Sequence, residues 1–545
     1  MKLRIGEYHY HTETIQVYAG GKPESLQVFE HPHHSKEMVF ILGDPILRKG
    51  EDFSYPELAD WKVLLHDEPR LNQLDGHYLV LIAAADEIRA YNDPLCKRSM
   101  WIHESSRGFF FCSEISLLKD AGLAELDLHK FGAYWHTMFP PNLRKYAPSS
   151  RSYYSNVEMM FQGSSAVINP SGLKISDTSY QVPSEELDLS KMLYNMTLLP
   201  LRAGRKVCLG LSGGMDSRSL LAILLDSGMD FWAVHLGRND TMDYRIAEAI
   251  ARDYGLDFRC ILEQDLKIQW DQVVNYMYTR GFGYNPATSC LMAYHPVIAE
   301  DADIFLGGCF GELYRLRFFA AHIASTFKLK TPDYRYFASY LYHKPVDFFI
   351  PEVNLQLHRS FMQDLSEVVA DMPPSKGMPR QLWMDIFLIR YSIRSIHMPD
   401  LINLDHYLHD FMPFLQPSLI GQHWHYGFFA QLNEKLHRDI IRRCAPGLQK
   451  YPLAMVDTAA GYHYRPYALK LKAYLQSRTS IAPNRNQAFL NTFKTQILDL
   501  AQEHRISLDS WIDHSKLQNI LDGYYGGRHE AQNAVLSFVA YALGK

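Results

Sequence analysis

Cysteine is scarce in this sequence, with seven residues among 545 and no CxxC pair. So few unpaired thiols exclude a disulfide scaffold and a zinc site of the usual spacing, and they indicate a reducing compartment. No apolar run reaches the length that a transmembrane helix needs. No apolar segment follows Met1 to Arg4 that would mark a signal peptide. We therefore expect a soluble, cytoplasmic protein.

An excess of charge of one sign is also missing. The 55 lysines and arginines are nearly balanced by 60 aspartates and glutamates, which leaves a formal net charge of -5. This balance gives no electrostatic footprint for nucleic acid or for an anionic membrane, so we expect neither as a partner. Oligomeric state leaves no comparable mark in the sequence, and a homodimer stays open.

The chain is too long for one compact core. Hydrophobic residues make up 47% of it, as in ordinary globular proteins. The pattern changes at a polar stretch, residues 182–186, which we interpret as a linker. The prediction is an α/β protein with two domains, at residues 1–185 and 186–545.

The first domain is predicted to be a packed β structure. Short apolar runs of the kind found in buried strands occur at residues 27–30, 38–42, 78–83, 108–112 and 166–168. Glycine, proline and asparagine favour turns, which predicts one turn at Gly43-Asp44-Pro45 and another from Asn169 to Gly172.

The second domain begins with an alternation of strands and helices. Strands are predicted at residues 205–211, 231–236, 258–262 and 304–306, and helices at residues 217–226 and 243–254. This alternation is typical of a doubly wound parallel sheet. From about residue 355 onward the patterns are mostly helical, as at residues 381–394 and 491–503, which predicts a helical C-terminal extension.

The motif with the clearest chemistry follows the first of these strands, where the chain reads Leu211-Ser-Gly-Gly-Met-Asp-Ser217. Glycines between a strand and a helix let backbone N–H groups approach phosphate oxygens, and the helix N-terminus adds partial positive charge. The hydroxyls of Ser212 and Ser217 can donate to the same phosphates. The carboxylate of Asp216 can hold Mg²⁺ on a triphosphate. The glycine-lysine-serine ending of a Walker loop is absent.

Other polar groups allow two interpretations. Asp240 and Asp243 follow the second predicted strand, and Asp243 suits either a ligand pocket or the cap of the next helix. Histidines gather early in the chain, and solvated surface positions are favoured over a metal site because their spacing is irregular. These histidines are His9, His11, His31, His33 and His34.

The SGGMDS segment resembles the pyrophosphate loop of the PP-loop ATP pyrophosphatases, whose pattern is SGGxDS. Members of that superfamily cleave ATP between the α and β phosphates and so form an adenylate. The resemblance implies that the nucleotide contacts Leu211, Ser212, Gly213, Gly214, Asp216, Ser217 and, on the next strand, Leu236. It also implies a PP-loop sheet in the second domain, with ATP and Mg²⁺ as cofactors.

Flanking segments resemble one branch, the asparagine synthetases. Residues 74–78 (LDGHY), 91–95 (YNDPL) and 111–115 (FCSEI) follow the order of motifs in the family's glutaminase domain. Residues 412–419 (MPFLQPSL) are similar to its "V-P-F-L-D" segment, and residues 438–442 (RDIIR) to its "K-x-L-L-R" segment. This resemblance implies that the first domain is an Ntn-hydrolase-like β-sandwich flanked by helices.

One departure concerns glutamine hydrolysis. Family glutaminases use an N-terminal cysteine, whereas this chain has Lys2 there and no cysteine before Cys96. A lysine cannot form the thioester, so the glutaminase-like domain is expected to be degenerate. The same domain without its cysteine occurs in β-lactam synthetases and lasso-peptide cyclases, which use the substrate's own amine.

A second departure concerns the family loop "S-G-x-G-x-D-E", which here reads Gly307-Gly-Cys-Phe-Gly-Glu312. Gly311 stands where the resemblance places a second metal-binding aspartate. We predict that Gly307 and Gly308 contact the nucleotide and that Glu312 serves as a catalytic and metal-binding residue; its alternative is to orient a nearby arginine. Arg438 replaces a family lysine and is predicted to steady the pyrophosphate.

The resemblance therefore implies an ATP-dependent, AMP-forming amide ligase without glutaminase activity. Its substrates would be a small-molecule or peptide carboxylate and an amine. Two alternatives stay open: an asparagine synthetase supplied with free ammonia, and a non-catalytic nucleotide-binding pseudo-synthetase. A PP-loop enzyme that modifies transfer RNA is disfavoured by the acidic balance and by the glutaminase-like domain.

Overall fold

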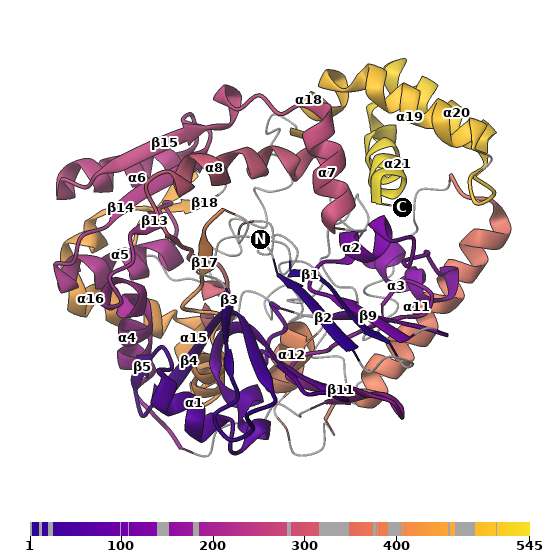
Figure 1. Ribbon diagram of the computed structural model, residues 1–545. Coiled ribbons are helices and arrows are strands. Elements are labelled where there is room, and N and C mark those ends of the chain that lie inside the picture. Colours follow the sequence, from indigo (N-terminus) through magenta and orange to yellow (C-terminus); the bar gives the residue numbers. More distant parts are fainter. Residues whose placement is uncertain are drawn as a thin grey trace.

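The computed structural model contains two large antiparallel sheets, one parallel sheet and a small two-stranded antiparallel sheet, surrounded by helices (Figure 1). It describes residues 3–9, 14–19, 26–98, 100–106, 108–138, 152–177, 185–280, 285–315, 348–373, 378, 380–390, 404, 407–455, 458–463, 485–507 and 509–544. The prediction of an α/β protein is confirmed.

The two large antiparallel sheets come from the first part of the chain. One has the strand order β10-β8-β9-β1-β2. Its strands are β1 (Leu3–His9), β2 (Thr14–Ala19), β8 (Trp101–Ser105), β9 (Gly108–Cys112) and β10 (Val157–Met159). The other has the order β12-β11-β7-β6-β4-β3, with β5 paired to β4. Its strands are β3 (Leu26–Glu30), β4 (Met38–Lys49), β5 (Asp52–Ser54), β6 (Asp75–Ala83), β7 (Ile88–Asn92), β11 (Ser164–Asn169) and β12 (Gly172–Asp177).

The two sheets enclose a shared apolar core. Leu79 and Leu81 of β6 meet Phe109 and Phe111 of β9 in one buried cluster. Alternate residues of β6, such as Val80 and Ile82, point the other way and pack on Trp61 of helix α1 (Leu58–Leu64). Further helices of this region are α2 (Ile115–Asp120) and α3 (Leu128–Met138). The expected β-sandwich with flanking helices is therefore observed.

The predicted turn at Gly43-Asp44-Pro45 is wrong, because β4 continues through these residues. Gly43 pairs with Tyr78 and Pro45 with Gly76 across the ladder to β6. Gly43 and Gly76 have φ values of +92° and +91°. A Cβ on Gly76 would lie 1.9 Å from the carbonyl oxygen of Asp44. The glycines thus permit a close approach of two strands rather than a chain reversal. The turn at Asn169 to Gly172 is confirmed as the connection from β11 to β12.

The parallel sheet has the strand order β15-β14-β13-β16-β17. Its strands are β13 (Val207–Gly210), β14 (Trp232–Gly237), β15 (Phe258–Leu262), β16 (Ile304–Leu306) and β17 (His409–Phe411). The first four match the predicted strands, whereas β17 was not predicted. One face packs on α4 (Leu189–Arg202), α5 (Met215–Ser227), α6 (Met242–Tyr254) and α16 (Lys435–Cys444). The opposite face, which includes Cys208 and Val234, packs on α8 (Tyr294–Ala299).

The C-terminal helices lie near the sandwich helices rather than on the parallel sheet (Figure 1). They are α18 (Arg485–Thr492), α19 (Lys494–Ile506), α20 (His514–Tyr525) and α21 (Gln532–Gly544). The single helix predicted at residues 491–503 is divided at Phe493 between α18 and α19. Before them come α7 (Trp270–Arg280), α11 (Pro351–Asp371), α12 (Arg380–Leu388), α14 (Pro417–His423) and α15 (Phe428–Leu432). Residues 391–394 of the helix predicted at 381–394 lie outside the described residues.

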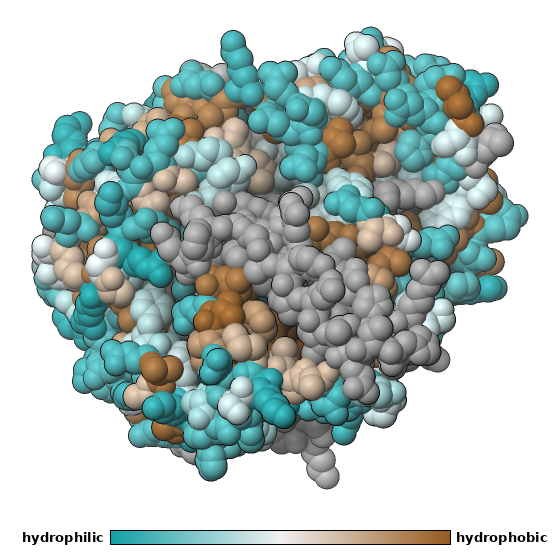
Figure 2. Space-filling model, viewed as in Figure 1, coloured by the Kyte–Doolittle hydropathy of each residue, from teal (hydrophilic) through white to brown (hydrophobic). Residues whose placement is uncertain are grey.

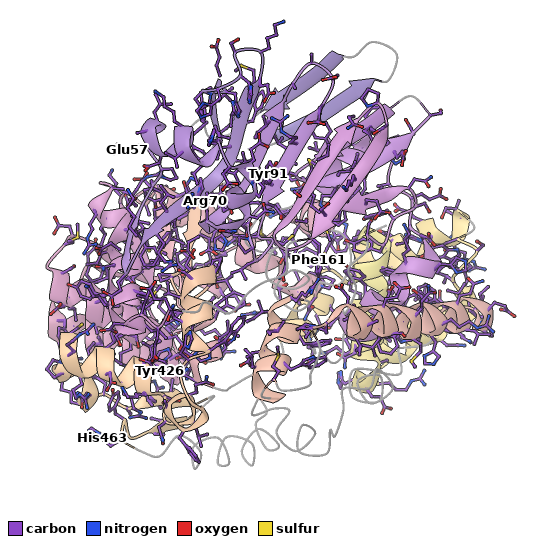
Figure 3. All side chains as sticks on the ribbon, turned by 90° about the horizontal axis from the view of Figure 1, so that it is seen from below. Glu57, Arg70, Tyr91, Phe161, Tyr426 and His463 are labelled. Atoms are coloured by element: carbon purple, nitrogen blue, oxygen red, sulfur yellow. The ribbon has the colours of Figure 1, made fainter. Side chains whose placement is uncertain are left out.

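Two of the flanking motifs contact each other across the boundary between the sandwich and the parallel sheet. The backbone N–H of Gly76 donates to Gln416 Oε1 at 2.7 Å, and that of Ser418 donates to Asp75 Oδ1 at 2.8 Å. Burial raises the pKa of Asp75 to about 6. Figure 3 shows the sandwich, marked by Glu57 and Tyr91, on the opposite side of the molecule from Tyr426 and His463. The motifs thus position the two parts of the chain against each other.

The described surface carries no continuous apolar belt in the view of Figure 2, where apolar residues lie in scattered groups among hydrophilic ones. Among the described helices, none is both long enough and apolar enough to cross a membrane. Among the described residues, these cysteines form no disulfide: Cys96, Cys112, Cys208, Cys260, Cys309 and Cys444.

Candidate functional site

The SGGMDS loop lies at the carboxyl end of β13, the middle strand of the parallel sheet. Helix α5 begins within this segment, at Met215, with Gly214 as its N-cap and no side chain capping it. In open α/β sheets, ligands bind at the carboxyl ends of the strands. The uncapped helix N-terminus is therefore placed where it can receive an anion.

Hydrogen bonds to nearby side chains hold the SGGMDS loop in its conformation. The N–H of Ser212 donates to Ser217 Oγ at 3.2 Å, and the N–H of Gly214 donates to Ser212 Oγ at 3.2 Å. The two serine hydroxyls are 2.9 Å apart. Asp243 Oδ1 accepts from the N–H of Gly213 at 2.9 Å. These side-chain oxygens accept hydrogen bonds from the backbone N–H groups of the loop, as phosphate oxygens would.

The structure decides the role of Asp243 that the sequence left open. Thr241 is the N-cap of α6 and accepts from the N–H of Tyr244 at 3.2 Å. Asp243 therefore bonds the SGGMDS loop instead of capping its own helix. Asp240 forms an exposed ion pair with Arg238 and does not reach the loop.

Close packing explains two glycines of the site. A Cβ on Gly213 would lie 2.8 Å from the Cβ of Ala454 in β18 (Leu453–Met455). The backbone N–H of Ala454 donates to the Gly213 carbonyl at 3.1 Å. A Cβ on Gly308 would lie 2.9 Å from the backbone nitrogen of Ser217. Glycine at both positions lets neighbouring segments contact the loop directly.

Arg218 is a buried residue of the site that the sequence did not single out. Its guanidinium donates to three carbonyl oxygens, those of Gly213 at 3.1 Å, Tyr451 at 3.0 Å and Pro452 at 2.6 Å. Burial lowers its pKa to about 10, so it stays charged at neutral pH. Arg218 thereby joins the loop to the segment that leads into β18. Its position directly after SGGMDS was the only available signal.

Asp216 is paired on both carboxylate oxygens. Arg315 donates to Oδ2, and Nε2 of the buried His437 lies 2.9 Å from Oδ1. Burial of Asp216 raises its carboxyl pKa, but Arg315 and His437 outweigh this effect and hold the pKa below its usual value. The Asp216 carboxylate is thus ionised, and the Arg315 guanidinium is its cationic partner.

The ion pairs continue beyond Arg315. Its second terminal nitrogen lies 3.6 Å from Glu434 Oε1, and Glu434 Oε2 lies 3.3 Å from Arg438. Arg438 also donates to the Tyr462 carbonyl at 2.8 Å. Asp216, Arg315, Glu434 and Arg438 therefore form one chain of alternating charge, which we call the acid–arginine chain. Of the predicted catalytic residues, Arg438 belongs to it.

Position 311 has no room for the aspartate that the resemblance would place there. A Cβ on Gly311 would lie 2.3 Å from Asp216 Oδ1 and 2.5 Å from its Cγ. Glu312 is half-buried on the same short helix, Gly311–Arg315. Burial lowers the pKa of Arg315, but the charges of Asp216, Glu434 and Glu312 outweigh it and raise the pKa above its usual value. Glu312 therefore acts on Arg315 through its charge.

The residues around Asp216 do not fit a resident magnesium ion. The Arg315 guanidinium already bonds one Asp216 oxygen, the imidazole of His437 lies 2.9 Å from the other, and Gly311 supplies no side-chain ligand. Within the described residues, Asp216 and Glu312 do not belong to a group of three convergent metal ligands. The predicted metal role of Asp216 and Glu312 is untested by any bound ion and stays a prediction.

The other residues predicted to contact the nucleotide differ in where they lie relative to the loop. Leu211 is buried, and its N–H donates to the Val234 carbonyl at 2.8 Å. Gly307 follows β16, and its N–H donates to the Phe411 carbonyl at 3.1 Å. Leu236 is half-buried in β14 on the sheet face that packs on α8. Gly307 and Gly308 thus lie beside the loop at the carboxyl ends of the strands.

The early histidines do not form an open metal site. His31, Glu37 and Glu68 have ligand atoms within 4.8 Å of one another. Arg89 bonds both carboxylates, at 2.6 Å to Glu37 and 2.9 Å to Glu68, and fills the position between them. The exposed histidines His33 and His34 agree with the solvated interpretation, whereas it is wrong for His31, which is buried. Two side chains lie outside the described residues: His9 and His11.

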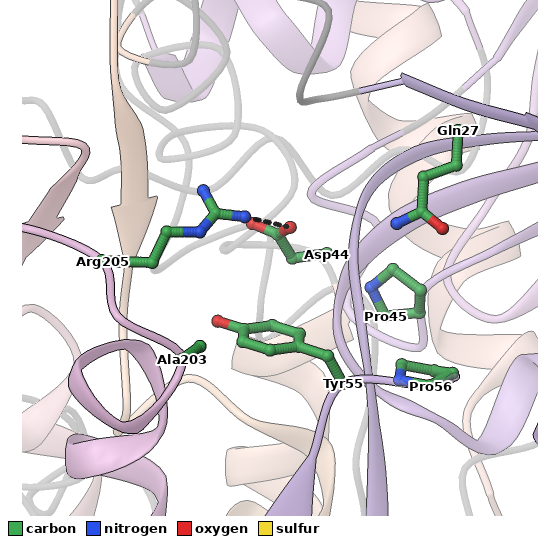
Figure 4. Close-up of a pocket in the computed structure, with 7 residues that line it drawn as sticks. All are labelled: Gln27, Asp44, Pro45, Tyr55, Pro56, Ala203 and Arg205. Atoms are coloured by element: carbon green, nitrogen blue, oxygen red, sulfur yellow. Dashed lines mark ion pairs between the residues drawn. The ribbon is translucent and has the colours of Figure 1, made fainter. Parts of the chain in front are cut away.

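A separate cavity of about 240 Å³ lies between the sandwich and the start of the parallel-sheet region (Figure 4). Asp44 pairs there with Arg205 at 4.0 Å and with His409 at 3.2 Å. Burial raises the pKa of the Tyr55 hydroxyl, which points toward Arg205 in Figure 4. The predicted site residues do not line this cavity, which is lined by Gln27, Asp44, Pro45, Tyr55, Pro56, Ala203 and Arg205.

Comparison with known proteins gives no family. No protein-family model and no curated protein matches the chain. Among solved structures, it is similar to the U34-tRNA thiolase NcsA from Methanococcus maripaludis with its 4Fe–4S cluster, at 15% identity and a TM-score of 0.17. That match covers 35% of this chain and 82% of the thiolase.

Two further structures match the chain at 13% identity with TM-scores of 0.18. One is the allosteric regulatory enzyme of purine biosynthesis, with 45% of this chain and 64% of that chain covered. The other is glutamine phosphoribosylpyrophosphate amidotransferase from B. subtilis complexed with ADP and GMP, with 46% and 50% covered. The chain thus spans less than two thirds of both. TM-scores this low carry no argument about function.

Proposed function

We propose that this protein binds ATP at residues 212–217, transfers AMP to a substrate carboxylate with release of pyrophosphate, and passes the acyl group to an amine. The observation that carries the proposal is the SGGMDS segment at the carboxyl end of the middle strand, which includes the uncapped N-terminus of α5. Such a position favours a phosphate chain. The resemblance of the flanking motifs to asparagine synthetases favours amide formation over other uses of an adenylate.

The residues of the loop have defined parts in this proposal. The N–H groups of residues 212–214 leave their side-chain acceptors and bond phosphate oxygens, and the hydroxyls of Ser212 and Ser217 turn toward the same oxygens. Magnesium arrives as part of the ATP substrate. Arg438 steadies the departing pyrophosphate, and Glu312 takes a proton from the attacking amine. Substrates are a small-molecule or peptide carboxylate and an amine, with ammonia as one candidate.

Glutamine is not the nitrogen source in this proposal. Position 2 is lysine, and a thioester needs a thiolate nucleophile. The amine therefore comes from the substrate itself or from solution.

The test is release of pyrophosphate from magnesium ATP in the presence of a panel of carboxylic acids, each with and without amines or ammonia. One acid should stimulate release, and AMP should form in equal amount. Ser217→Ala should lower this rate roughly 10-fold by removing a phosphate donor. Ser227→Ala, at the other end of the same helix, is the matched control and should leave the rate unchanged.

A specific observation favours a second candidate, a nucleotide-binding pseudo-synthetase. Asp216 is already paired with Arg315 and His437, and Gly311 offers no second carboxylate. Binding of a non-hydrolysable ATP analogue without pyrophosphate release for any acid would favour this candidate. Absence of both binding and release would overturn both candidates.

A further inference from the structure

We propose that the guanidinium of Arg315 takes the place of a divalent cation between the carboxylates of Asp216 and Glu434. One terminal nitrogen bonds Asp216 Oδ2, and the other lies 3.6 Å from Glu434 Oε1. A cation bridging two carboxylates would contact the same two side chains. The proposal does not depend on the proposed reaction, because it concerns what these carboxylates bind before any nucleotide arrives.

Burial makes this internal cation necessary. The side chains of Asp216, Glu434 and Arg315 are 17%, 7% and 12% exposed. Two carboxylates so far removed from water need a positive partner, since an unpaired buried charge is strongly destabilising. Arg315 lies between them, and Arg438 lies on the outer side of Glu434. The four side chains thus pair two negative charges with two positive ones.

The local packing agrees with an arginine rather than a metal. Gly311 lies so close to Asp216 that a side chain there would overlap the carboxylate. Position 311 therefore cannot contribute a metal ligand, and the same short helix instead presents Arg315 four residues later. Oxygen ligands from Asp216 and Glu434, with the imidazole of His437 at 2.9 Å from Asp216, are suited to Mg²⁺ or Mn²⁺ once the guanidinium is removed.

The experiment is a Mn²⁺ titration of the full-length, nucleotide-free protein, read by the loss of the free-ion EPR signal. Wild type should bind Mn²⁺ at this site no more tightly than about 1 mM. Arg315→Gln should create one site at least roughly 10-fold tighter, because it exposes two carboxylates without a cation. Adding Asp216→Asn to that variant should abolish the new site.

The matched control is Arg259→Gln. Arg259 also bridges two carboxylates, at 2.6 Å from Asp301 and 3.3 Å from Asp257, but on the exposed surface. Water solvates those carboxylates after the change, so no comparable Mn²⁺ site should form. A new site of equal affinity in Arg259→Gln would overturn the proposal, because any freed carboxylate pair would then suffice.

A thermal measurement that does not need Arg315→Gln can also overturn the proposal, which matters if that variant does not fold. Ligands that bind the folded state raise its thermal midpoint. Addition of Mn²⁺ should leave the wild-type midpoint unchanged, whereas a rise of several degrees that Asp216→Asn abolishes would show a resident metal site. No nucleotide is present in these measurements, so failure of ATP turnover would leave their outcome untouched.

Discussion

At the scale of single residues, the position of the Asp216 carboxylate depends on the absence of a side chain at Gly311. The missing side chain at position 311 leaves the space that the Asp216 carboxylate occupies. A residue that the sequence presents as a lost ligand is, in the structure, a requirement for packing. Restoring an aspartate there would place two carboxylates in one volume without adding a metal site.

We predict that Gly311→Ala lowers the free energy of unfolding by about 1–3 kcal/mol, as overpacking does in a closely packed region. The new Cβ would stand 2.3 Å from Asp216 Oδ1, so the carboxylate or the short helix must move. Urea denaturation measures the change. Gly427→Ala is the control, because a Cβ on Gly427 meets no atom within 4 Å, and its stability should stay near that of wild type. Equal stability of the two variants would contradict this reading of position 311.

At the scale of elements, Arg218 joins the SGGMDS loop to the segment before β18 through three carbonyl oxygens. We predict that Arg218→Met destabilises the protein by about 3 kcal/mol, since it removes charged hydrogen bonds and leaves buried carbonyls without donors. Nucleotide binding should weaken with it, because the Gly213 carbonyl belongs to the loop. Denaturation and calorimetric titration measure the two effects.

Arg252→Met is the comparison for that change. Arg252 is 74% exposed on α6 and pairs with Asp253 at 3.5 Å. An exposed pair of this kind contributes at most about 1 kcal/mol, so both stability and binding should hardly change. Arg218→Lys should fall between wild type and Arg218→Met. If it equals wild type, the charge rather than the three-way hydrogen bonding is what matters.

The contact between β6 and α14 makes a prediction about pH. Burial raises the pKa of Asp75 to about 6 in the folded protein, whereas an unfolded aspartate has about 3.9. The folded state therefore binds more protons between these values, and stability falls as pH rises through this window and stays lower above it. Asp75→Asn retains an acceptor for the N–H of Ser418 and loses the charge. It should be more stable than wild type at pH 7, by at most about 3 kcal/mol.

Denaturation of both proteins at pH 4 and pH 7 measures that difference, which should be largest at pH 7 and vanish near pH 4. Asp67→Asn is the control, because Asp67 is 55% exposed, and it should show no such dependence. A gain from Asp75→Asn that is equal at both pH values would assign the effect to hydrogen bonding rather than to the ionisation of Asp75.

At the scale of the whole molecule, one apolar core spans the two predicted domains. It contains Ile115 and Trp135 from the sandwich helices together with Met277, Leu357 and Phe538 from later helices. The predicted boundary near residue 185 therefore separates the sandwich sheets from the parallel sheet, but this apolar core extends across it. A shared core of this kind couples the unfolding of its parts.

We predict a single unfolding transition and test it at Gly132, where α3 crosses α11. A Cβ on Gly132 would lie 2.0 Å from the Leu357 carbonyl, and the N–H of Gly132 donates to Ser360 Oγ at 3.1 Å. Gly132→Ala should destabilise by roughly 3 kcal/mol. Hydrogen exchange in β6 and in β13 should report equal losses of protection. A loss confined to the sandwich would show two independent units.

The sequence determined the local parts of this protein. The alternating strands and helices of residues 205–262 were predictable because parallel strands covered on both faces are short apolar runs, readable without knowledge of their partners. The SGGMDS segment could be recognised for the same reason, since Ser212, Gly213 and Ser217 lie within six consecutive positions of the chain. The apolar strands of the sandwich and its last hairpin also followed from local pattern.

Only the tertiary structure decided the rest of the site. Arg315 meets Asp216 across 99 positions, Tyr451 meets Arg218 across 233, and Asp75 meets Ser418 across 343. The short strand β17 and the course of β4 through Gly43 and Pro45 likewise depend on neighbouring strands. Local pattern records which residues prefer burial or a turn. Which charge becomes the partner of a buried carboxylate depends on segments that approach each other only when the sheets and helices pack.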